Sequence, residues 1–255
     1  MKKPPRNSRR RKGKPDRDSA RQSRSSRELS ILYEDDALVV VNKPAGLLAV
    51  PIRGSDTPSA LSLLSAELKL KRQRALIVHR IDRFASGILL FAKTDRDRDA
   101  LVRQFLAHTP VRQYLAVVRG RLNAPAGTLV HYFRREGMYQ QLRTARDPQA
   151  ARAELRYSVD CLFADASLVR VELVTGLQNQ IRAQFSALGH PVIGDRKYHR
   201  KEASEQLIAR VALHAAQLQF VHPRSGKTVS IDCEPPADFQ HLVRELSQSP
   251  RRSRR

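Results

Sequence analysis

One acidic residue of this chain has the neighbours that a catalytic carboxylate needs. Asp82 lies between Arg80 and Arg83, with His79 before them and a Ser-Gly pair after them at residues 86–87. A carboxylate beside cations stays ionised even where water is excluded, because nearby positive charge favours the charged form. Such a group can attack an electrophile or stabilise a developing positive charge. Asp82 is therefore our first candidate for a catalytic residue.

Two further residues, Tyr114 and Arg182, have side chains that could serve the same reaction. Tyr114 lies in the apolar run 113–119. Arg182 follows Ile181 in a segment whose apolar residues have helical spacing. A planar, permanently charged guanidinium suits a bidentate contact with a carboxylate better than an ammonium does. Taken alone, each residue also has an ordinary explanation: a stacked core tyrosine, a solvated helix arginine and, for Asp82, a surface ion pair.

Four segments of the chain, taken in order, resemble the motifs of the RluA family of RNA pseudouridine synthases. An ordered set of this kind is far more specific than a single motif. The resemblance covers residues 30–240 and implies an isomerase that converts uridine in RNA to pseudouridine. The segments are residues 36–46, which end in Asn-Lys-Pro-Ala-Gly; residues 79–94 around Asp82; residues 113–120 around Tyr114; and residues 175–182, Thr-Gly-Leu-Gln-Asn-Gln-Ile-Arg, followed by residues 189–198.

The implied reaction detaches uracil from the ribose at N1, turns it and rejoins it through C5. Because nothing is oxidised and no group is lost, we expect neither a cofactor nor a metal ion. The resemblance implies that Asp82 is the nucleophile or charge stabiliser, toward either the sugar or the base, and that Arg182 pairs with it. Tyr114 would lie against the flipped base and accept or relay a proton. For a phenol with a pKa of about 10, that role requires activation by its neighbours.

Four residues are expected to contact the RNA or to support the base. Arg80 would insert into the RNA stack as the target uridine leaves, which offsets part of the few kcal/mol that base flipping costs. Ile181 would pack under Tyr114, although simple core packing predicts the same burial. Arg83 and Lys43 are candidates for phosphate contacts.

The sequence departs from the family pattern at three positions. The fourth segment usually reads Thr-Gly-Arg-x-His-Gln-Ile-Arg, but here Leu177 replaces the arginine and Asn179 replaces the histidine. Ala85 stands where threonine is usual. These changes affect substrate contacts more than catalysis, because the three candidate catalytic residues are all present. His79 is expected to be structural, since the reaction needs no histidine.

The charge of the chain points to a polyanionic partner. Lysine and arginine number 47 against 25 acidic residues, a net charge of +22. Residues 1–28 carry +9, the last five residues +4 and residues 29–249 the remaining +9. Nucleic acid is the commonest such partner, and the resemblance implies rRNA or tRNA. We expect a disordered basic tail over 1–28, a stand-alone catalytic domain over 29–247 with no added N-terminal RNA-binding domain, and a basic tail over 248–255.

Short strands at hairpin spacing, with scattered helices, predict an α+β fold: a mainly antiparallel mixed sheet with flanking helices, the fold that the resemblance also implies. Strands are expected near residues 31–33, 38–41, 88–92, 113–119, 128–133, 152–161, 168–174, 215–221 and 228–231. Helices are expected after a cap at Asp56 or Thr57, from Thr94 to residue 108, over 179–188, and near the C-terminus with Phe239, Leu242, Val243 and Leu246 facing inward.

Several other features narrow the class of protein. Cys161 and Cys233 lie in apolar, strand-like contexts without clustered histidines, so we expect two buried thiols and neither a disulfide nor a zinc site. No apolar run is long enough to span a membrane. No apolar segment follows the basic N-terminus, as it would in a secretory signal. The Arg/Ser-rich, acid-poor N-terminus is also compatible with an organelle transit peptide or a nuclear signal, but it lacks the apolar residues of an amphipathic helix, which favours an RNA-contacting arm. We expect a cytoplasmic protein and a monomer.

Two other functions compete with the isomerase. A non-catalytic RNA-binding or ribosome-assembly factor could use the same basic cleft, and net charge alone fits both. The combination of Asp82, Tyr114 and Arg182 favours the enzyme. A glycoside hydrolase is disfavoured, because the motif supplies one carboxylate where two are normally needed.

Overall fold

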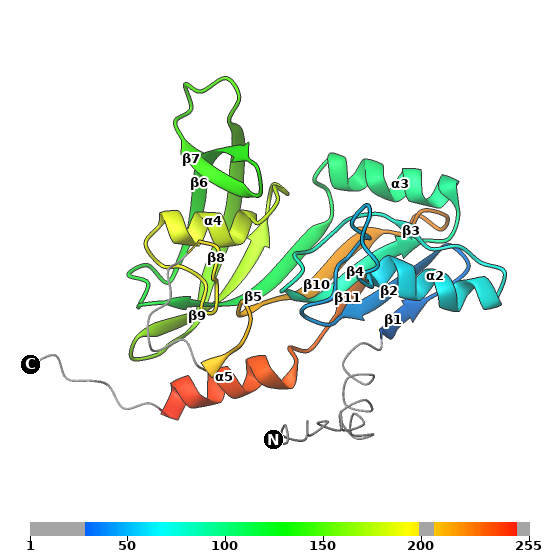
Figure 1. Cartoon of the computed structure of the whole chain (residues 1–255). Coiled ribbons are helices and arrows are strands. Elements are labelled where there is room, and N and C mark those ends of the chain that lie inside the picture. Colours follow the sequence, from blue (N-terminus) through cyan, green and yellow to red (C-terminus); the bar gives the residue numbers. More distant parts are fainter. Residues whose placement is uncertain (1–28, 199–206, 249–255) are drawn as a thin grey trace, which may run out of the picture.

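The computed structural model describes residues 29–198 and 207–248, which contain eleven strands and four helices (Figure 1). The predicted tails, apart from residue 248, lie outside the described residues. The strands are β1 Ser30–Glu34, β2 Leu38–Lys43, β3 Leu76–Ile77, β4 Ser86–Ala92, β5 Val111–Arg119, β6 Ala126–Glu136, β7 Tyr139–Arg143, β8 Ala151–Leu162, β9 Ala166–Leu173, β10 Leu213–Val221 and β11 Thr228–Asp232. The helices are α2 Ala60–Leu70, α3 Asp95–Leu106, α4 Gln180–Ala187 and α5 Ala237–Gln248.

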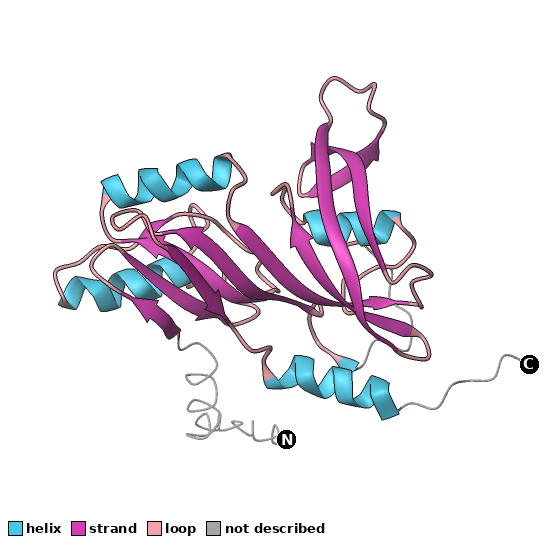
Figure 2. Cartoon of the chain, turned by 180° about the vertical axis from the view of Figure 1, so that it is seen from behind, coloured by secondary structure: helices cyan, strands magenta, loops and turns pink. Residues whose placement is uncertain are grey.

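All eleven strands belong to one sheet, in the order β1-β2-β4-β10-β5-β9-β8-β6-β7, with β11 paired to β10 and β3 to β4. Strands β4 and β10 run parallel, and the other strand pairs of the described residues are antiparallel. The predicted α+β fold with a mainly antiparallel mixed sheet is therefore confirmed. Helices α3 and α4 lie on one side of the sheet and α5 lies on the other, as the two opposite views show (Figures 1 and 2).

The strand that follows Asp82 is buried on both faces, which explains its unbroken apolar sequence. Ile88 and Leu90 face the main core, whereas Leu89 and Phe91 face a second core covered by α2. At the start of this strand, Gly87 has a φ of +110°, and a Cβ there would lie 2.2 Å from the carbonyl oxygen of Ala215. Only glycine allows β4 to approach β10 so closely, and this approach fixes where the Asp82 loop enters the sheet.

The helices begin at hydrogen-bonding caps, one of which differs from the prediction. Thr94 caps α3 as expected, and its side chain accepts a hydrogen bond from the Asp97 amide. Helix α2 begins later than predicted, because Ser59 forms a reciprocal capping box with Ser62 and Pro58 lies before the helix. The predicted cap at residues 56–57 is therefore wrong.

Two features at the far end of the sheet differ from what the sequence predicted. Strand β7 was not predicted, because its sequence Tyr-Gln-Gln-Leu-Arg lacks an alternating apolar pattern. Cys161 is exposed, whereas Cys233 is buried as expected. The pairing of β8 with β9 shifts register between Val159 and Cys161, and such a bulge turns the following side chain out of the regular alternation. No helix within the described ranges is long and apolar enough to cross a membrane.

Candidate active site

Asp82 and Arg182 meet at one end of a pocket, although they lie far apart in sequence. Asp82 is in the loop between β3 and β4, and Arg182 is in the first turn of α4. The Arg182 Nη1 atom lies 3.3 Å from Asp82 Oδ2. The side chain of Arg182 is 7% exposed and that of Asp82 is 18% exposed, so the guanidinium is enclosed while the carboxylate remains accessible from the pocket. The predicted pair is therefore present in space.

The bidentate partner of Arg182 is a second carboxylate, Asp195, and not Asp82 as the sequence suggested. The Arg182 Nε and Nη2 atoms each donate to one oxygen of Asp195 at 2.7 Å. Asp195 is fully buried, and it also accepts hydrogen bonds from the amides of Lys197 and Tyr198. Burial acts to lower the pKa of Arg182, but the hydrogen bonds and charge of Asp195, helped by Asp82, raise it overall. The guanidinium is thus held in place without using its contact to Asp82.

Asp195 was missed as a site residue by the sequence reasoning. Its segment, Gly-Asp-Arg-Lys-Tyr, was noted for its resemblance to the family, but nothing in the sequence places it beside Arg182. The available signal was the resemblance of its segment to the family, because the contact with Arg182 arises only when the two segments meet in the fold.

Tyr114 is buried on β5 and lines the same pocket. Burial raises the pKa of its phenol to about 12, with the Asp82 charge adding to this effect and Arg112 opposing it. The activation that a proton acceptor would need is therefore lacking in the free enzyme, where the phenol is protonated at neutral pH. Ile181 is buried in the same apolar cluster as Tyr114 and also lines the pocket. Both its predicted role and simple core packing predict this burial, so the burial does not distinguish them.

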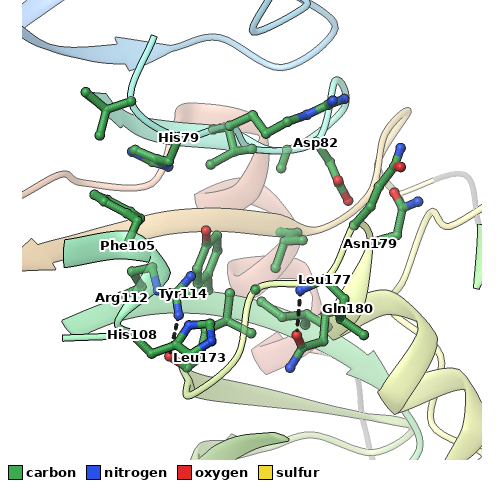
Figure 3. Close-up of a pocket in the computed structure, with 18 of the residues that line it drawn as sticks. His79, Asp82, Phe105, His108, Arg112, Tyr114, Leu173, Leu177, Asn179 and Gln180 are labelled. Atoms are coloured by element: carbon green, nitrogen blue, oxygen red, sulfur yellow. Dashed lines mark hydrogen bonds between the residues drawn. The ribbon is translucent and has the colours of Figure 1, made fainter. Parts of the chain in front are cut away.

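The pocket has a volume of about 520 Å³ and two distinct ends (Figure 3). Asp82 and Asn179 lie at one end and Tyr114 lies between the ends. The other end is formed by His79, Phe105, His108 and Arg112. The pocket therefore extends from Asp82 past Tyr114 to the side chains around Phe105.

Arg112 supports this pocket from the far end and was not singled out from the sequence. It is buried, and its Nη2 atom donates to the carbonyls of Leu173, Val174 and Thr175 at 3.2, 3.3 and 3.3 Å. Figure 3 shows the bond to Leu173. These carbonyls belong to the segment that leads into α4, so Arg112 fixes the approach to Arg182. Its position two residues before Tyr114 on a strand, on the same face, was the available signal.

Lys43 does not occupy the position expected for a phosphate contact. Its side chain is fully buried, and its ammonium donates to the carbonyls of Pro44, Leu47, Arg83 and Ala85 at 2.8–3.1 Å. Burial lowers its pKa to about 7, an effect that the nearby Asp82 carboxylate opposes. Because backbone carbonyls surround the ammonium, no donor is left for RNA. Lys43 instead fixes both sides of the loop that carries Asp82.

The two arginines that flank Asp82 are both exposed. Arg80 lines the pocket, and its side chain has no hydrogen-bond partner among the described residues. Arg83 donates through Nε to the carbonyl of Gly46 at 3.0 Å and lies over the ring of Phe84. The structure therefore brings Arg80 to the pocket together with Asp82, Tyr114 and Arg182, and places Arg83 outside it.

His79 has the structural position that the sequence indicated. It accepts a hydrogen bond from the Leu90 amide at 3.2 Å and stacks on Phe105 with ring centroids 4.6 Å apart. Burial, with the Arg112 charge adding, lowers its pKa to about 3. The ring is therefore neutral at physiological pH. Within residues 29–198 and 207–248, no group of three His, Cys, Asp or Glu side chains is arranged to hold a metal ion.

The matches to known proteins place this chain among RNA-modifying isomerases. Residues 37–187 match the family model described as RNA pseudouridylate synthase. The chain is 37% identical over 235 residues to the ribosomal large subunit pseudouridine synthase D of Zymomonas mobilis, covering 88% of this chain and 74% of the relative. It is 35% identical to the uncharacterized RNA pseudouridine synthase YlyB of Bacillus subtilis, covering 87% of this chain and 74% of the relative.

The chain therefore belongs to the RNA pseudouridylate synthase family, and the predicted family is confirmed. The structure of human RNA pseudouridylate synthase domain containing 4 has the same fold, with a TM-score of 0.71 at 22% identity over 85% of this chain and 92% of that one. The protein is an isomerase that converts uridine in RNA to pseudouridine. The alternative of a non-catalytic RNA-binding factor is not favoured.

Proposed function

We propose that this enzyme modifies a uridine of large-subunit ribosomal RNA and that Asp82 is its nucleophile. Asp82 lines a pocket of about 520 Å³ and contacts the buried Arg182 at 3.3 Å, and this is the observation that carries the assignment of Asp82. The names of the relatives in Zymomonas mobilis and Neisseria meningitidis, both large-subunit rRNA pseudouridine synthases, support the choice of RNA. We propose further that the enzyme acts in the cytoplasm and as a monomer.

In the proposed reaction, the ionised Asp82 attacks C1′ of the ribose or C6 of the base. The bond between C1′ and N1 then breaks, and uracil takes its electron pair. The freed base turns, a bond forms between C5 and C1′, and the bond to Asp82 breaks, which returns the free carboxylate. The proton on C5 is lost and N1 gains one, so that atoms and charge balance. We assign Tyr114 to stacking on the base, with proton relay only after the base has left C1′, because its pKa of about 12 makes it a poor acceptor in the free enzyme.

We assign Arg80 to the space that the flipped uridine leaves in the RNA. Its exposure at the rim of the pocket, without a side-chain partner among the described residues, suits a group that must move to stack on bases. Arg83, exposed on the outside of the same loop, suits a phosphate contact. Ile181 supports the ring of Tyr114 from below.

Mapping of pseudouridine in total RNA tests this function. In cells that lack the gene, at least one pseudouridine of large-subunit rRNA should be missing, and wild-type protein should restore it. Protein with Asp82→Asn should not restore it. If the missing site lies in tRNA, the proposed RNA is wrong, and if the Asp82→Asn protein restores modification, the proposed nucleophile is wrong.

A further inference from the structure

Asn179, the residue that departs from the family pattern at the entrance to α4, has an unusual set of contacts. It precedes the helix in a left-handed conformation, with φ of 55° and ψ of 24°, and its side chain makes no capping hydrogen bond. Instead its Oδ1 atom accepts a hydrogen bond from Arg182 Nη1 at 2.9 Å. The same Nη1 atom contacts Asp82. Asn179 therefore lies directly beside the proposed nucleophile.

The orientation of the Asn179 amide follows from chemistry. A guanidinium can only donate hydrogen bonds, so the oxygen of the amide must face Arg182 and the Nδ2 group must point elsewhere. Nδ2 is buried and has no hydrogen-bond partner among the described residues. Buried donors without partners are rare, because each costs about 1–3 kcal/mol. Asn179 is only 8% exposed and lines the pocket, so a bound molecule supplies an acceptor to Nδ2 once its binding moves the atoms that cover this group.

The backbone around Asn179 is fixed before any substrate binds. The side-chain oxygen of Gln180 accepts hydrogen bonds from the hydroxyl of Thr175 and the amide of Leu177, both at 2.9 Å (Figure 3). The Nε2 atom of Gln180 donates to the carbonyl of Glu154 at 2.9 Å. The backbone that carries the Asn179 side chain is thus held in position and does not need to be ordered by the ligand.

We propose that Nδ2 of Asn179 donates a hydrogen bond to a carbonyl oxygen of the target uracil, an assignment that rests on the proposed function. A neutral donor with the apolar side chains of Leu177 and Ile181 nearby suits a neutral carbonyl better than a phosphate. When the bond between C1′ and N1 breaks, negative charge spreads to both carbonyl oxygens of uracil. A fixed donor then binds the departing base more strongly than it binds the uridine, which lowers the barrier.

A cycle of protein and substrate changes tests this assignment. The substrate is a synthetic RNA containing the uridine that mapping shows to depend on this chain, whichever RNA that is. Its variants carry 2-thiouridine, 4-thiouridine or 2′-deoxyuridine at this one position. The enzyme variant is Asn179→Gly, because glycine adopts the left-handed conformation without strain. It removes both the Nδ2 donor and the Oδ1 contact with Arg182, and the comparison between substrates separates the two effects.

The expected result is coupling between Asn179 and one carbonyl of the base. Asn179→Gly should lower kcat/KM for ordinary RNA by about 10- to 100-fold. One of the two thio substitutions, since sulfur is a poor acceptor, should lower kcat/KM of the wild type and leave Asn179→Gly without further loss. The 2′-deoxy substitution should cost both enzymes equally.

If the thio substitutions lower kcat/KM equally in both enzymes, the proposal is wrong. It is also wrong if the effect of Asn179→Gly is coupled only to the 2′-deoxy substitution, because the donor would then bind the sugar. If Asn179→Gly fails to fold, Asn179→Asp carries the same test, because it keeps the size and the Arg182 contact but offers no donor. A wrong choice of target RNA leaves this cycle intact. Activity of Asp82→Asn on the same RNA would refute the proposed nucleophile without bearing on Asn179.

Discussion

At the scale of single residues, the site depends on one guanidinium that serves two carboxylates. Arg182 makes two bonds of 2.7 Å to the buried Asp195 and one longer contact to Asp82. Charge-assisted bidentate pairs are the stronger and geometrically more specific kind. Asp195 therefore fixes the guanidinium, and Asp82 can turn toward a substrate without leaving a buried cation unpaired.

Replacement of Asp195 by asparagine should cost both stability and activity. Removing one partner of a buried ion pair typically destabilises a protein by about 3 kcal/mol or more. We expect Asp195→Asn to show such a loss in urea unfolding and to lower kcat by about 100-fold, because Arg182 is no longer held. Asp99→Asn, at an exposed ion pair with Arg98, is the control and should change stability by less than about 0.5 kcal/mol. Unchanged kcat in Asp195→Asn would show that Arg182 needs no support.

The neutral state of His79 predicts how stability depends on pH. Its pKa is lowered to about 3 in the folded protein, against about 6.5 in an unfolded chain, so the unfolded chain binds the proton more readily. Stability from this group is present above pH 6.5 and is lost as the pH falls toward 3. Between pH 7.5 and 5.0 the loss should be about 2 kcal/mol.

His79→Gln should reduce this pH dependence, because glutamine keeps an acceptor for the Leu90 amide but does not titrate. Urea unfolding of both proteins at the two pH values measures the difference. An equally steep loss in His79→Gln would mean that other groups cause it.

At the scale of elements, two loops are joined to position Asp82. Lys43, at the end of β2 where the first loop begins, donates through its ammonium to the carbonyls of Arg83 and Ala85. The amide of Gly46 adds a bond of 2.8 Å to the carbonyl of Arg83. The loop before β4 thus acquires a defined shape although it has no regular secondary structure at Asp82.

Lys43→Met should loosen this connection while keeping the length of the side chain. The carbonyls left without a donor should cost about 3 kcal/mol or more of stability, and activity should fall because the Asp82 loop moves. Lys71→Met, at a lysine whose side chain is 49% exposed, is the matched control and should be nearly neutral. A stable and fully active Lys43→Met protein would contradict the positioning role.

The elements also show what sequence patterns can and cannot predict. Helix α3 was predicted correctly because Thr94 and the spacing of its apolar residues are local signals. The burial of Lys43 and the pairing of Arg182 with Asp195 were not predicted, since both arise where distant segments meet. A lysine is usually exposed, and only the fold surrounds this one with carbonyls. Asp82, Tyr114 and Arg182 were found because a resemblance supplied the long-range information.

At the scale of the whole molecule, residues of both α3 and α4 line the pocket. These two helices lie over different halves of the sheet (Figure 1). Strand β5 carries Tyr114 and Arg112 between the two halves, paired to β10 on one side and β9 on the other. The chain carries a net charge of +22, which attracts the negatively charged RNA backbone to the protein.

Removal of residues 1–28, which contain 12 of the basic residues, should weaken RNA binding and flatten its dependence on salt. Each phosphate that the protein no longer neutralises reduces the slope of log K against log salt by about 0.7–0.9. A chain with these basic residues changed to serine is the control for length. Equal slopes in filter binding of all three proteins would show that this segment binds no phosphate.

Release of the C5 hydrogen is the most direct test of the Asp82 carboxylate as the nucleophile. RNA labelled with tritium at C5 of its uridines loses the label to water only when C5 bonds to the ribose. Wild-type protein in excess should release the label from the mapped uridine. Asp82→Asn should release it at least about 1,000-fold more slowly while binding the RNA with nearly unchanged affinity. Release at a rate close to that of the wild type would contradict the account.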